Sequence, residues 1–392
     1  MTSTAPAGEP GAATLKAAAR AYDVGIAGAG QLARMTVLAA WPLGIRVAVL
    51  GGADEPAGPM AAGVVPGDWR RAEDVLALAR EVGTVTLENE FVDAAALAAV
   101  EAAGTPVRPS PRTLAVVQDK ALQKRLLADA GLPVPRFLVV ERPEELAAAG
   151  RDLGWPLVLK ARRLGYDGYG NATCADEEEA AAALARLDAG DGVLVERFVP
   201  FERELAVMVA RAPSGPPRAY PVVETVQRHH VCHEVIAPAP VPGALAGRAV
   251  DVALAAAAAA EGVGVTGVEL FQLQDGTVLV NELAPRPHNS GHYTIEACET
   301  SQFENHLRGV LDLPLGSTEL RAPAAMVNLL GQRAGPAEPR LERALAVEGA
   351  HVHLYDKREV RVRRKMGHVT ALGRTVEEAL RRARAAAAAV AI

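Results

Sequence analysis

The segment GVELFQLQDGTVLVNELAPRPHNSGH, residues 267–292, constrains the fold of this chain more than any other stretch. Its central Asp-Gly pair predicts a two-residue hairpin turn, because both residue types tolerate positive φ. The flanks are rich in apolar and β-branched residues, which strands prefer. If Gln274 and Thr277 close the turn, the same register places Glu269 directly opposite Glu282 on one face of the hairpin.

Two facing carboxylates need a neutralising partner. Opposed β carbons lie roughly 5 Å apart, and like charges at that separation destabilise a sheet. The candidates are a shared proton, a basic side chain such as Arg286, and a bound cation. Mg²⁺ is usually held by one or two carboxylates together with phosphate oxygens. We therefore predict a metal site at Glu269 and Glu282, with a salt bridge to Arg286 or a solvated sheet face as the alternatives.

Length, charge and cysteine content limit the class of protein. The 392 residues suffice for two or three domains. The formal net charge of −6 argues against a general nucleic-acid binder. Three widely spaced cysteines without a CxxC pattern predict a reducing, cytoplasmic location and no disulfide framework.

No apolar run reaches membrane-spanning length. Residues 1–20, rich in Ala, Gly, Pro and Thr, predict a disordered extension.

The N-terminal part has a βαβ pattern. A strand at 22–27 leads into GAGQLA at 28–33, and a helix and a strand at 45–50 follow. The Gly-x-Gly-x-x-Ala spacing exposes backbone amides to an anion at a helix start, so an NAD-dependent dehydrogenase is one alternative. A purely structural βα turn is the other. Glu88 lies near the carboxyl end of a later strand, where open α/β sheets bind ligands.

The middle of the chain carries candidate phosphate ligands. Ser110 can cap a helix that we expect to run to Gly131. This helix presents Lys120 and Lys124 on one face, and we expect Lys124 to be solvated. Lys160 ends a strand just before the glycine-rich LGYDGYGN. Free backbone amides and a lysine charge suit a cover over phosphates, and an ordinary glycine-rich hairpin is the alternative.

Two later segments are unusually polar. APRPHNSGH at 284–292 concentrates Arg, His, Asn and Ser in a loop held by two prolines, which predicts a substrate loop. YDKREVRVRRKMGH at 355–368 carries many positive charges on an acidic protein. It predicts either a phosphate clamp or a basic surface strand.

Taken in order, these features resemble a known family. Lys120, Lys160, the glycine-rich loop, VERF at 195–198, Glu204 and the two-glutamate hairpin resemble the ATP-grasp fold. The segments GAGQLARM, GYDGYGN, NELAPRPHNSGH, SQFENHLRGVLDLPLG and YDK…RKMGH resemble the 5-(carboxyamino)imidazole ribonucleotide synthases (PurK). The resemblance covers residues 22–375.

The resemblance implies an α/β fold in three parts. They are an N-terminal βαβ Rossmann-like domain, a central ATP-grasp domain with a mobile lid, and a small β-rich C-terminal domain. The expected boundaries, after the extension at 1–20, are 21–115, 116–315 with the lid at roughly 135–200, and 316–392.

The resemblance also implies an activity. The enzyme would be an ATP-dependent ligase of purine biosynthesis that phosphorylates bicarbonate to carboxyphosphate. It would then carboxylate the exocyclic amine of 5-aminoimidazole ribonucleotide (AIR). Mg²⁺ or Mn²⁺ would be the cofactor, and the protein would be a homodimer. The alternatives are another ATP-grasp ligase such as a formate-dependent glycinamide ribonucleotide transformylase, the dehydrogenase, and a non-catalytic nucleotide sensor.

Site assignments follow from the resemblance by position. Glu269 and Glu282 would bind the metal, and the catalytic residues would be Arg286, His288 and Asp167. ATP would be bound by Lys120, Lys160, Gly165, Tyr166, Asp167, Gly168, Tyr169, Gly170, Asn171, Glu196, Arg197, Phe198, Val199, Glu204, Gln227, Asn281 and Glu282. AIR would be bound by Gln31, Glu88, Tyr166, Asp167, Arg286, His288, Asn289, Ser290, Lys357 and Arg364.

The sequence departs from the family pattern in two places. Leu164 stands where the lid usually has its first glycine, and Tyr169 stands where it usually has a basic residue. We expect the backbone cover to remain and the basic side-chain contact to be lost. The usual RPGRK reads RVRRK at 361–365, which keeps Arg364 but changes the turn.

Overall fold

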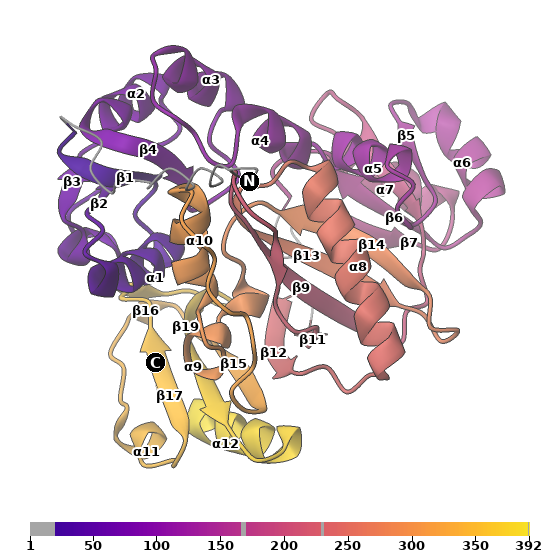
Figure 1. Ribbon diagram of the computed structural model, residues 1–392. Helices are drawn as coiled ribbons and strands as arrows, with labels where there is room; N and C mark the ends of the chain where they lie inside the picture. The colour runs from indigo at the N-terminus through magenta and orange to yellow at the C-terminus, as the bar shows by residue number, and fades with distance from the viewer. Residues whose placement is uncertain (1–19, 166–169, 229–230, 391) are drawn as a thin grey trace, which may run out of the picture.

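A computed structural model describes residues 20–165, 170–228, 231–390 and 392 (Figure 1). The predicted α/β class is confirmed. Residues 1–19 of the predicted extension and residues 166–169 of the predicted lid lie outside the described residues. Among the helices of the described ranges, none has the length and apolar character needed to cross a membrane.

The N-terminal sheet is parallel, with the strand order β3-β2-β1-β4. Its elements are β1 (Tyr22–Ala27), α1 (Gln31–Ala40), β2 (Val47–Leu50), β3 (Gly63–Val65), α2 (Ala72–Glu81), β4 (Val82–Leu87) and α3 (Ala94–Ala102). One core cluster packs α2 and α3 on one face, and another packs α1 and a later helix, α10 (Gln302–Val310), on the other. Because β1 and β4 are parallel neighbours, the turn after β1 lies beside the residues that follow β4.

A small antiparallel sheet follows, with the order β5-β8-β6-β7. Its elements are β5 (Phe137–Val140), α6 (Leu146–Leu153), β6 (Leu157–Ala161), β7 (Asn171–Cys174), α7 (Glu177–Leu187) and β8 (Val193–Arg197). The two helices cover one face with a common core. Val158 pairs with Glu196, so Glu196 and Lys160 share the opposite face, which these helices leave uncovered.

The largest sheet has the order β14-β13-β9-β11-β12-β15-β19-β17, and β10 pairs with β9. Its strands are β9 (Arg203–Arg211), β10 (Arg218–Ala219), β11 (Val223–Arg228), β12 (Val231–Ala237), β13 (Gly264–Gln272), β14 (Val278–Ala284), β15 (Ala324–Leu330), β17 (Ala350–Leu354) and β19 (Lys365–Leu372). A short pair, β16 (Gly335–Pro336) and β18 (Glu359–Val360), lies apart. Because β12 pairs with β15, the C-terminal strands extend the sheet of the central part.

Helices cover this sheet unevenly (Figure 1). The helix α8 packs on β9, β13 and β14, and α12 packs on β15 and β19. The remaining helices are α8 (Gly243–Ala259), α9 (Thr294–Ala297), α10 (Gln302–Val310), α11 (Glu342–Leu345) and α12 (Val376–Ala389), with 3₁₀ turns at Trp41–Leu43, Gly58–Met60, Pro143–Glu145 and Asn289–Gly291. On β9 and β13, Glu204 and Glu269 point away from α8 because the strand period is two.

The single helix predicted from Ser110 to Gly131 is two helices, α4 (Pro111–Gln118) and α5 (Lys120–Asp129). Asp119 interrupts it with extended backbone angles, φ −107° and ψ 107°. Its carboxylate accepts hydrogen bonds from the first amides of α5 and pairs with Arg162. The break makes Lys120 the first residue of α5.

The predicted opposition of Glu269 and Glu282 is confirmed, although the turn is longer than predicted. Leu273 N donates to Thr277 O at 2.9 Å, so three residues form the loop. Gly276 closes it with φ +81°, the left-handed position typical of three-residue hairpin loops.

Candidate active site

A cavity of about 940 Å³ opens between the N-terminal sheet, the small sheet and the largest sheet. The predicted residues that line it are Gln31, Glu88, Lys120, Lys160, Gly165, Asn171, Glu204, Gln227, Glu269, Asn281, Glu282, Arg286, His288, Asn289, Lys357 and Arg364. The described predicted residues that do not line it are Gly170, Glu196, Arg197, Phe198, Val199 and Ser290. Tyr166, Asp167, Gly168 and Tyr169 lie outside the described residues.

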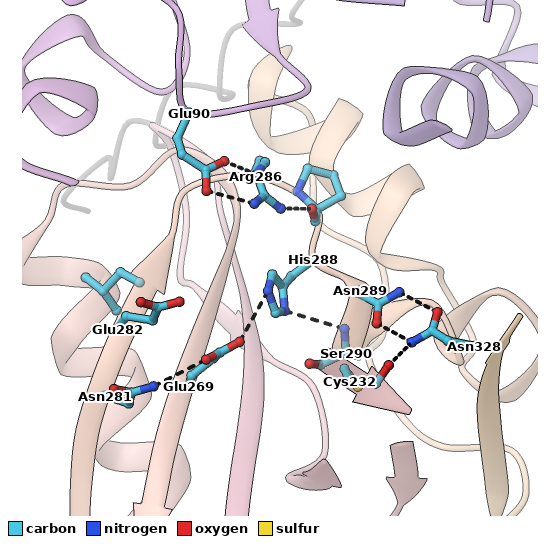
Figure 2. Close-up of polar contacts among 12 residues, drawn as sticks. Glu90, Cys232, Glu269, Asn281, Glu282, Arg286, His288, Asn289, Ser290 and Asn328 are labelled. Atoms are coloured by element: carbon cyan, nitrogen blue, oxygen red, sulfur yellow. Dashed lines mark hydrogen bonds and ion pairs between the residues drawn. The ribbon is translucent and has the colours of Figure 1, made fainter. Parts of the chain in front are cut away.

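A β-bulge in β14 shapes the carboxylate end of the cavity. The register shifts between Glu269 and Leu270, so Asn281 is the extra residue on β14. The shift offsets the longer turn and restores the pairing of Glu269 with Glu282. It also turns Asn281 toward the same face, where its Nδ2 lies 3.4 Å from Glu269 Oε2 (Figure 2).

The two glutamates are neutralised in different ways. Lys120 Nζ forms an ion pair with Glu282. Burial would raise the pKa of Glu282, but the charges of Lys120 and Lys160 more than offset it and hold the pKa below its usual value. Burial and the neighbouring Glu282 charge raise the pKa of Glu269 to about 8. Without a ligand, Lys120 therefore balances the charge of Glu282, and the raised pKa of Glu269 favours its protonated form.

The facing carboxylates of Glu269 and Glu282 fit a divalent cation. Within the described ranges, no cluster of three or more His, Cys, Asp or Glu side chains is arranged to hold a metal. Two carboxylates are nevertheless enough for Mg²⁺ when phosphate oxygens complete the coordination. A cation would relieve the repulsion between the two facing carboxylates, which contributes to the raised pKa of Glu269.

Arg286 pairs with Glu90, not with the facing glutamates. Its Nη2 donates to Glu90 Oε1 at 2.9 Å, and its Nε donates to the other carboxylate oxygen. Burial alone would raise the pKa of Glu90, but the Arg286 charge and hydrogen bonds lower it. Glu90 follows β4, whereas Arg286 follows β14, so the pair joins the two walls of the cavity (Figure 2). Such a planar two-point pair fixes the orientation of the guanidinium.

His288 lies between Arg286 and the glutamates. Its Nε2 is 3.4 Å from Glu269 Oε1, and its Nδ1 accepts a hydrogen bond from Ser290 N at 3.4 Å (Figure 2). Burial, followed by the Arg286 charge, lowers the pKa of His288 to about 4. The ring is therefore neutral at physiological pH.

Two amide side chains that the sequence did not indicate hold this loop. Asn289 and Asn328 exchange hydrogen bonds of 3.0 and 2.7 Å, and Asn328 also donates to Cys232 O at 2.9 Å (Figure 2). Gln302 accepts from His288 N at 3.0 Å and donates to His288 O at 2.8 Å. Asn328 on β15 is 39 residues from Asn289 in sequence, and Gln302 on α10 is 14 residues from His288, so both lie outside the polar segment itself.

The glycine-rich turn after β1 binds a carboxylate of the protein itself. Glu88 accepts hydrogen bonds from Gly30 N at 2.8 Å and Ala33 N at 3.3 Å at the start of α1. A β carbon at Gly30 would lie 2.7 Å from this carboxylate, and one at Gly28 2.5 Å from the Glu88 side chain. The glycines therefore make room for Glu88. This arrangement argues against the dehydrogenase, because the helix start that a pyrophosphate would need is occupied.

Glu204 lies on the same cavity face as Glu269. Burial raises the pKa of Glu204 to about 7, although a hydrogen bond with Gln227 lowers it in part. One of its oxygens is buried without a hydrogen-bond partner. The carboxyl is therefore suited to accept hydrogen bonds from hydroxyl groups of a ligand.

The basic C-terminal segment closes one side of the cavity. Lys357 and Arg364 line it, and Lys357 Nζ donates to Lys365 O at 2.8 Å. Arg363, at the position of the family's glycine, has φ +66°, so it keeps the left-handed turn at a steric cost. Leu164, the other replaced glycine, has φ +60°. Both residues thus have the left-handed backbone conformation that glycine adopts most easily.

Family models match most of the chain. The ribonucleotide synthetase preATP-grasp domain matches residues 21–118, the ATP-grasp domain residues 125–303, and the phosphoribosylaminoimidazole carboxylase C-terminal domain residues 324–382.

Curated relatives are similar over nearly the whole chain. The N5-carboxyaminoimidazole ribonucleotide synthase of Synechococcus elongatus is 45% identical over 353 residues, 88% of each protein. The phosphoribosylaminoimidazole carboxylase of Schizosaccharomyces pombe is 44% identical over 92% of this chain. The chain spans only 66% of the length of that yeast protein.

A solved structure is similar to this chain in fold. The Aspergillus clavatus N5-carboxyaminoimidazole synthase, in complex with ADP and 5-aminoimidazole ribonucleotide, has a TM-score of 0.85 and 38% identity. The match covers 93% of this chain and 96% of that one.

Proposed function

Because the chain belongs to the N5-carboxyaminoimidazole ribonucleotide synthases, a family of ATP-grasp ligases, we propose that it carboxylates AIR with ATP and bicarbonate. One observation carries the proposal: the same cavity is lined by two facing carboxylates, two lysines and the Arg286–His288 loop. The products would be N5-carboxyaminoimidazole ribonucleotide, ADP and phosphate, in purine biosynthesis.

The reaction would proceed in two steps. A bicarbonate oxygen attacks the γ-phosphorus of ATP, which gives carboxyphosphate and releases ADP. The exocyclic amine of AIR then attacks the carboxyl carbon of carboxyphosphate, or CO₂ released from it. Phosphate leaves and the amine loses a proton. Phosphoryl transfer depends mainly on positioning and charge stabilisation, which the lysines and Arg286 would supply.

Each group of residues would have one task. Lys120 and Lys160 would bind ATP phosphates, and Glu204 the ribose hydroxyls. Glu269 and Glu282 would hold Mg²⁺, which would neutralise the phosphate charge. Arg286, oriented by Glu90, would bind the bicarbonate-derived anion. The neutral His288 would take up the proton of the amine.

The AIR nucleotide would lie on the other side of the cavity. Asn289 and Glu88 would contact it, and Lys357 and Arg364 would bind its 5′-phosphate. The three buried cysteines fit a reducing compartment, and we keep the cytoplasm as the proposed location. The homodimer that the resemblance implies stays a prediction, to be measured by light scattering.

The test measures ADP release with ATP, Mg²⁺ and bicarbonate, with and without AIR. Wild type is compared with Glu282→Gln and with Glu234→Gln, a buried carboxylate in another part of the fold that pairs with Arg384. We expect AIR-stimulated release in wild type and Glu234→Gln and none in Glu282→Gln. Absence of AIR stimulation in folded wild-type protein would refute the proposal. Turnover with formate and glycinamide ribonucleotide would support the transformylase.

A further inference from the structure

Lys124 belongs to a closed ring of four polar residues beside the cavity. Its Nζ donates to Asn281 O at 2.6 Å, and Asn281 Oδ1 accepts from Lys160 Nζ at 3.1 Å. Lys160 Nζ lies 2.6 Å from Glu196 Oε2, and Glu196 Oε1 lies 2.9 Å from Lys124 Nζ. The ring joins α5, β14, β6 and β8. It therefore links the small sheet to the bulged edge strand of the largest sheet.

Three oxygen atoms surround the Lys124 ammonium. The prediction that this residue is solvated was wrong, because its side chain is only 2% exposed. Its Nζ forms an ion pair with Glu196 Oε1 and donates hydrogen bonds to two acceptors, Asn281 O and, at 3.1 Å, Val280 O. Two of these acceptors are the carbonyls at the β14 bulge. The buried lysine thus ties the bulge to Glu196.

The ring contains more positive than negative charges. Two lysines surround one glutamate, and Glu196 is 3% exposed, so it requires a buried cation as partner. Of the three charged residues of the ring, Lys160 lines the cavity, whereas Lys124 and Glu196 do not. If Lys124 were neutral, Lys160 alone would balance Glu196. With Lys124 charged, the ring keeps one surplus positive charge at the cavity wall.

We propose that Lys124 is a positioning residue that neutralises Glu196 and thereby leaves the charge of Lys160 available for the nucleotide phosphates. The proposal rests on the proposed ATP-binding role of Lys160. It assigns no substrate contact to Lys124 itself. Its effect on nucleotide affinity passes through Glu196 and Lys160.

The test uses three variants of the full chain and one probe, the non-hydrolysable Mg²⁺ complex of AMP-PNP, titrated by calorimetry. Lys124→Met removes the charge and keeps the length of the side chain. Glu196→Gln removes the carboxylate, and the double variant removes both. Glu234→Gln is the matched control, because it breaks another buried ion pair, that of Glu234 with Arg384.

A charged hydrogen bond contributes about 1.5–3 kcal/mol, so Lys124→Met should weaken binding roughly 10- to 100-fold. We expect Glu234→Gln to stay within about threefold of wild type. In the Glu196→Gln background, Lys124→Met should change binding by less than about threefold, because no carboxylate is then left for Lys124 to neutralise. The loss of the Lys124→Met effect in that background separates charge compensation from a loss of packing, since the second substitution repairs no cavity.

Two results would overturn the proposal. One is a folded Lys124→Met that binds the probe as tightly as Glu234→Gln, and the other is a double variant that binds at least tenfold more weakly than Glu196→Gln. If Lys124→Met alone does not fold, the comparison of the double variant with Glu196→Gln still decides. The titration contains neither AIR nor bicarbonate. Failure of the carboxylation reaction and failure of this proposal are therefore distinguishable.

Discussion

Glu204 makes the stability of the ligand-free protein depend on pH. Its pKa rises from 4.5 to about 7 in the folded state, chiefly through burial. A raised carboxyl pKa means that the folded state binds the proton more tightly than the unfolded state. The contribution of Glu204 to the free energy of unfolding is fully present below pH 4.5. It falls as the pH rises from 4.5 to 7, and above pH 7 the lost free energy stays constant.

The size of the lost free energy follows from the pKa shift of Glu204. Each pKa unit corresponds to 1.36 kcal/mol, so the shift sets an upper bound of roughly 3 kcal/mol. The side chain is partly exposed, and solvent screening reduces this to about 2–3 kcal/mol. Glu204→Gln has no titrating carboxyl and escapes the loss. Because the entropy of unfolding grows with chain length, we expect its melting temperature at pH 8 to exceed that of wild type by roughly 2–4 °C.

The assay is differential scanning calorimetry of both proteins between pH 4.5 and 8 without nucleotide. The difference in melting temperature should grow from near zero at pH 4.5 and level off above pH 7. Glu178→Gln, a substitution of an exposed glutamate on α7, should show a flat profile. A pH-independent difference, or a variant less stable than wild type at pH 8, would refute the reasoning.

Substitutions at three further positions test other parts of the site. Glu90→Gln should lower kcat/KM for AIR roughly 10- to 100-fold, because Arg286 loses its orienting carboxylate, and leave the affinity for the nucleotide unchanged by calorimetry. His288→Ala should lower carboxylation about 100-fold or more while ADP formation continues, seen by assaying both products; unchanged carboxylation would exclude proton transfer by His288. Arg363→Gly should unfold at or above the wild-type temperature, whereas Arg363→Val should cost about 1–2 kcal/mol, because a β-branched residue fits φ +66° poorly. Equal melting temperatures for the two Arg363 variants would show that the turn carries no strain.

The hairpin shows how far the sequence alone could lead. Local turn chemistry predicted the opposition of Glu269 and Glu282, and the structure confirms the pair. Two errors in that prediction cancel, however. The turn is one residue longer than predicted, and the bulge at Asn281 shifts the register back. A bulge is set by neighbouring elements, here Lys124 on α5, and the hairpin sequence carries no sign of it.

Partners that are distant in the sequence explain the other differences between the predictions and the structure. Lys124 lies among charged residues on a helix, and a solvated face is the ordinary expectation for such a pattern. Its burial depends on Glu196, which comes from another sheet. Asp119 interrupts the predicted helix because Arg162, beyond β6, pairs with its carboxylate. The Gly-x-Gly-x-x-Ala turn suggested an anion site, and the anion is Glu88 of the same chain.

The charge pairs of the cavity explain how the proposed site for metal and phosphate stays folded without them. Lys120 with Glu282 and Arg286 with Glu90 each join a cation to a carboxylate on a different element. A half-buried charge left without a partner would destabilise the fold, so mutual pairing stabilises the ligand-free protein. A metal nucleotide carries both charge types. Under the proposed function, Glu282 would bind the metal in place of Lys120, and Lys120 would bind a phosphate in place of Glu282. Binding would then exchange one set of ion pairs for another and leave neither charge without a partner.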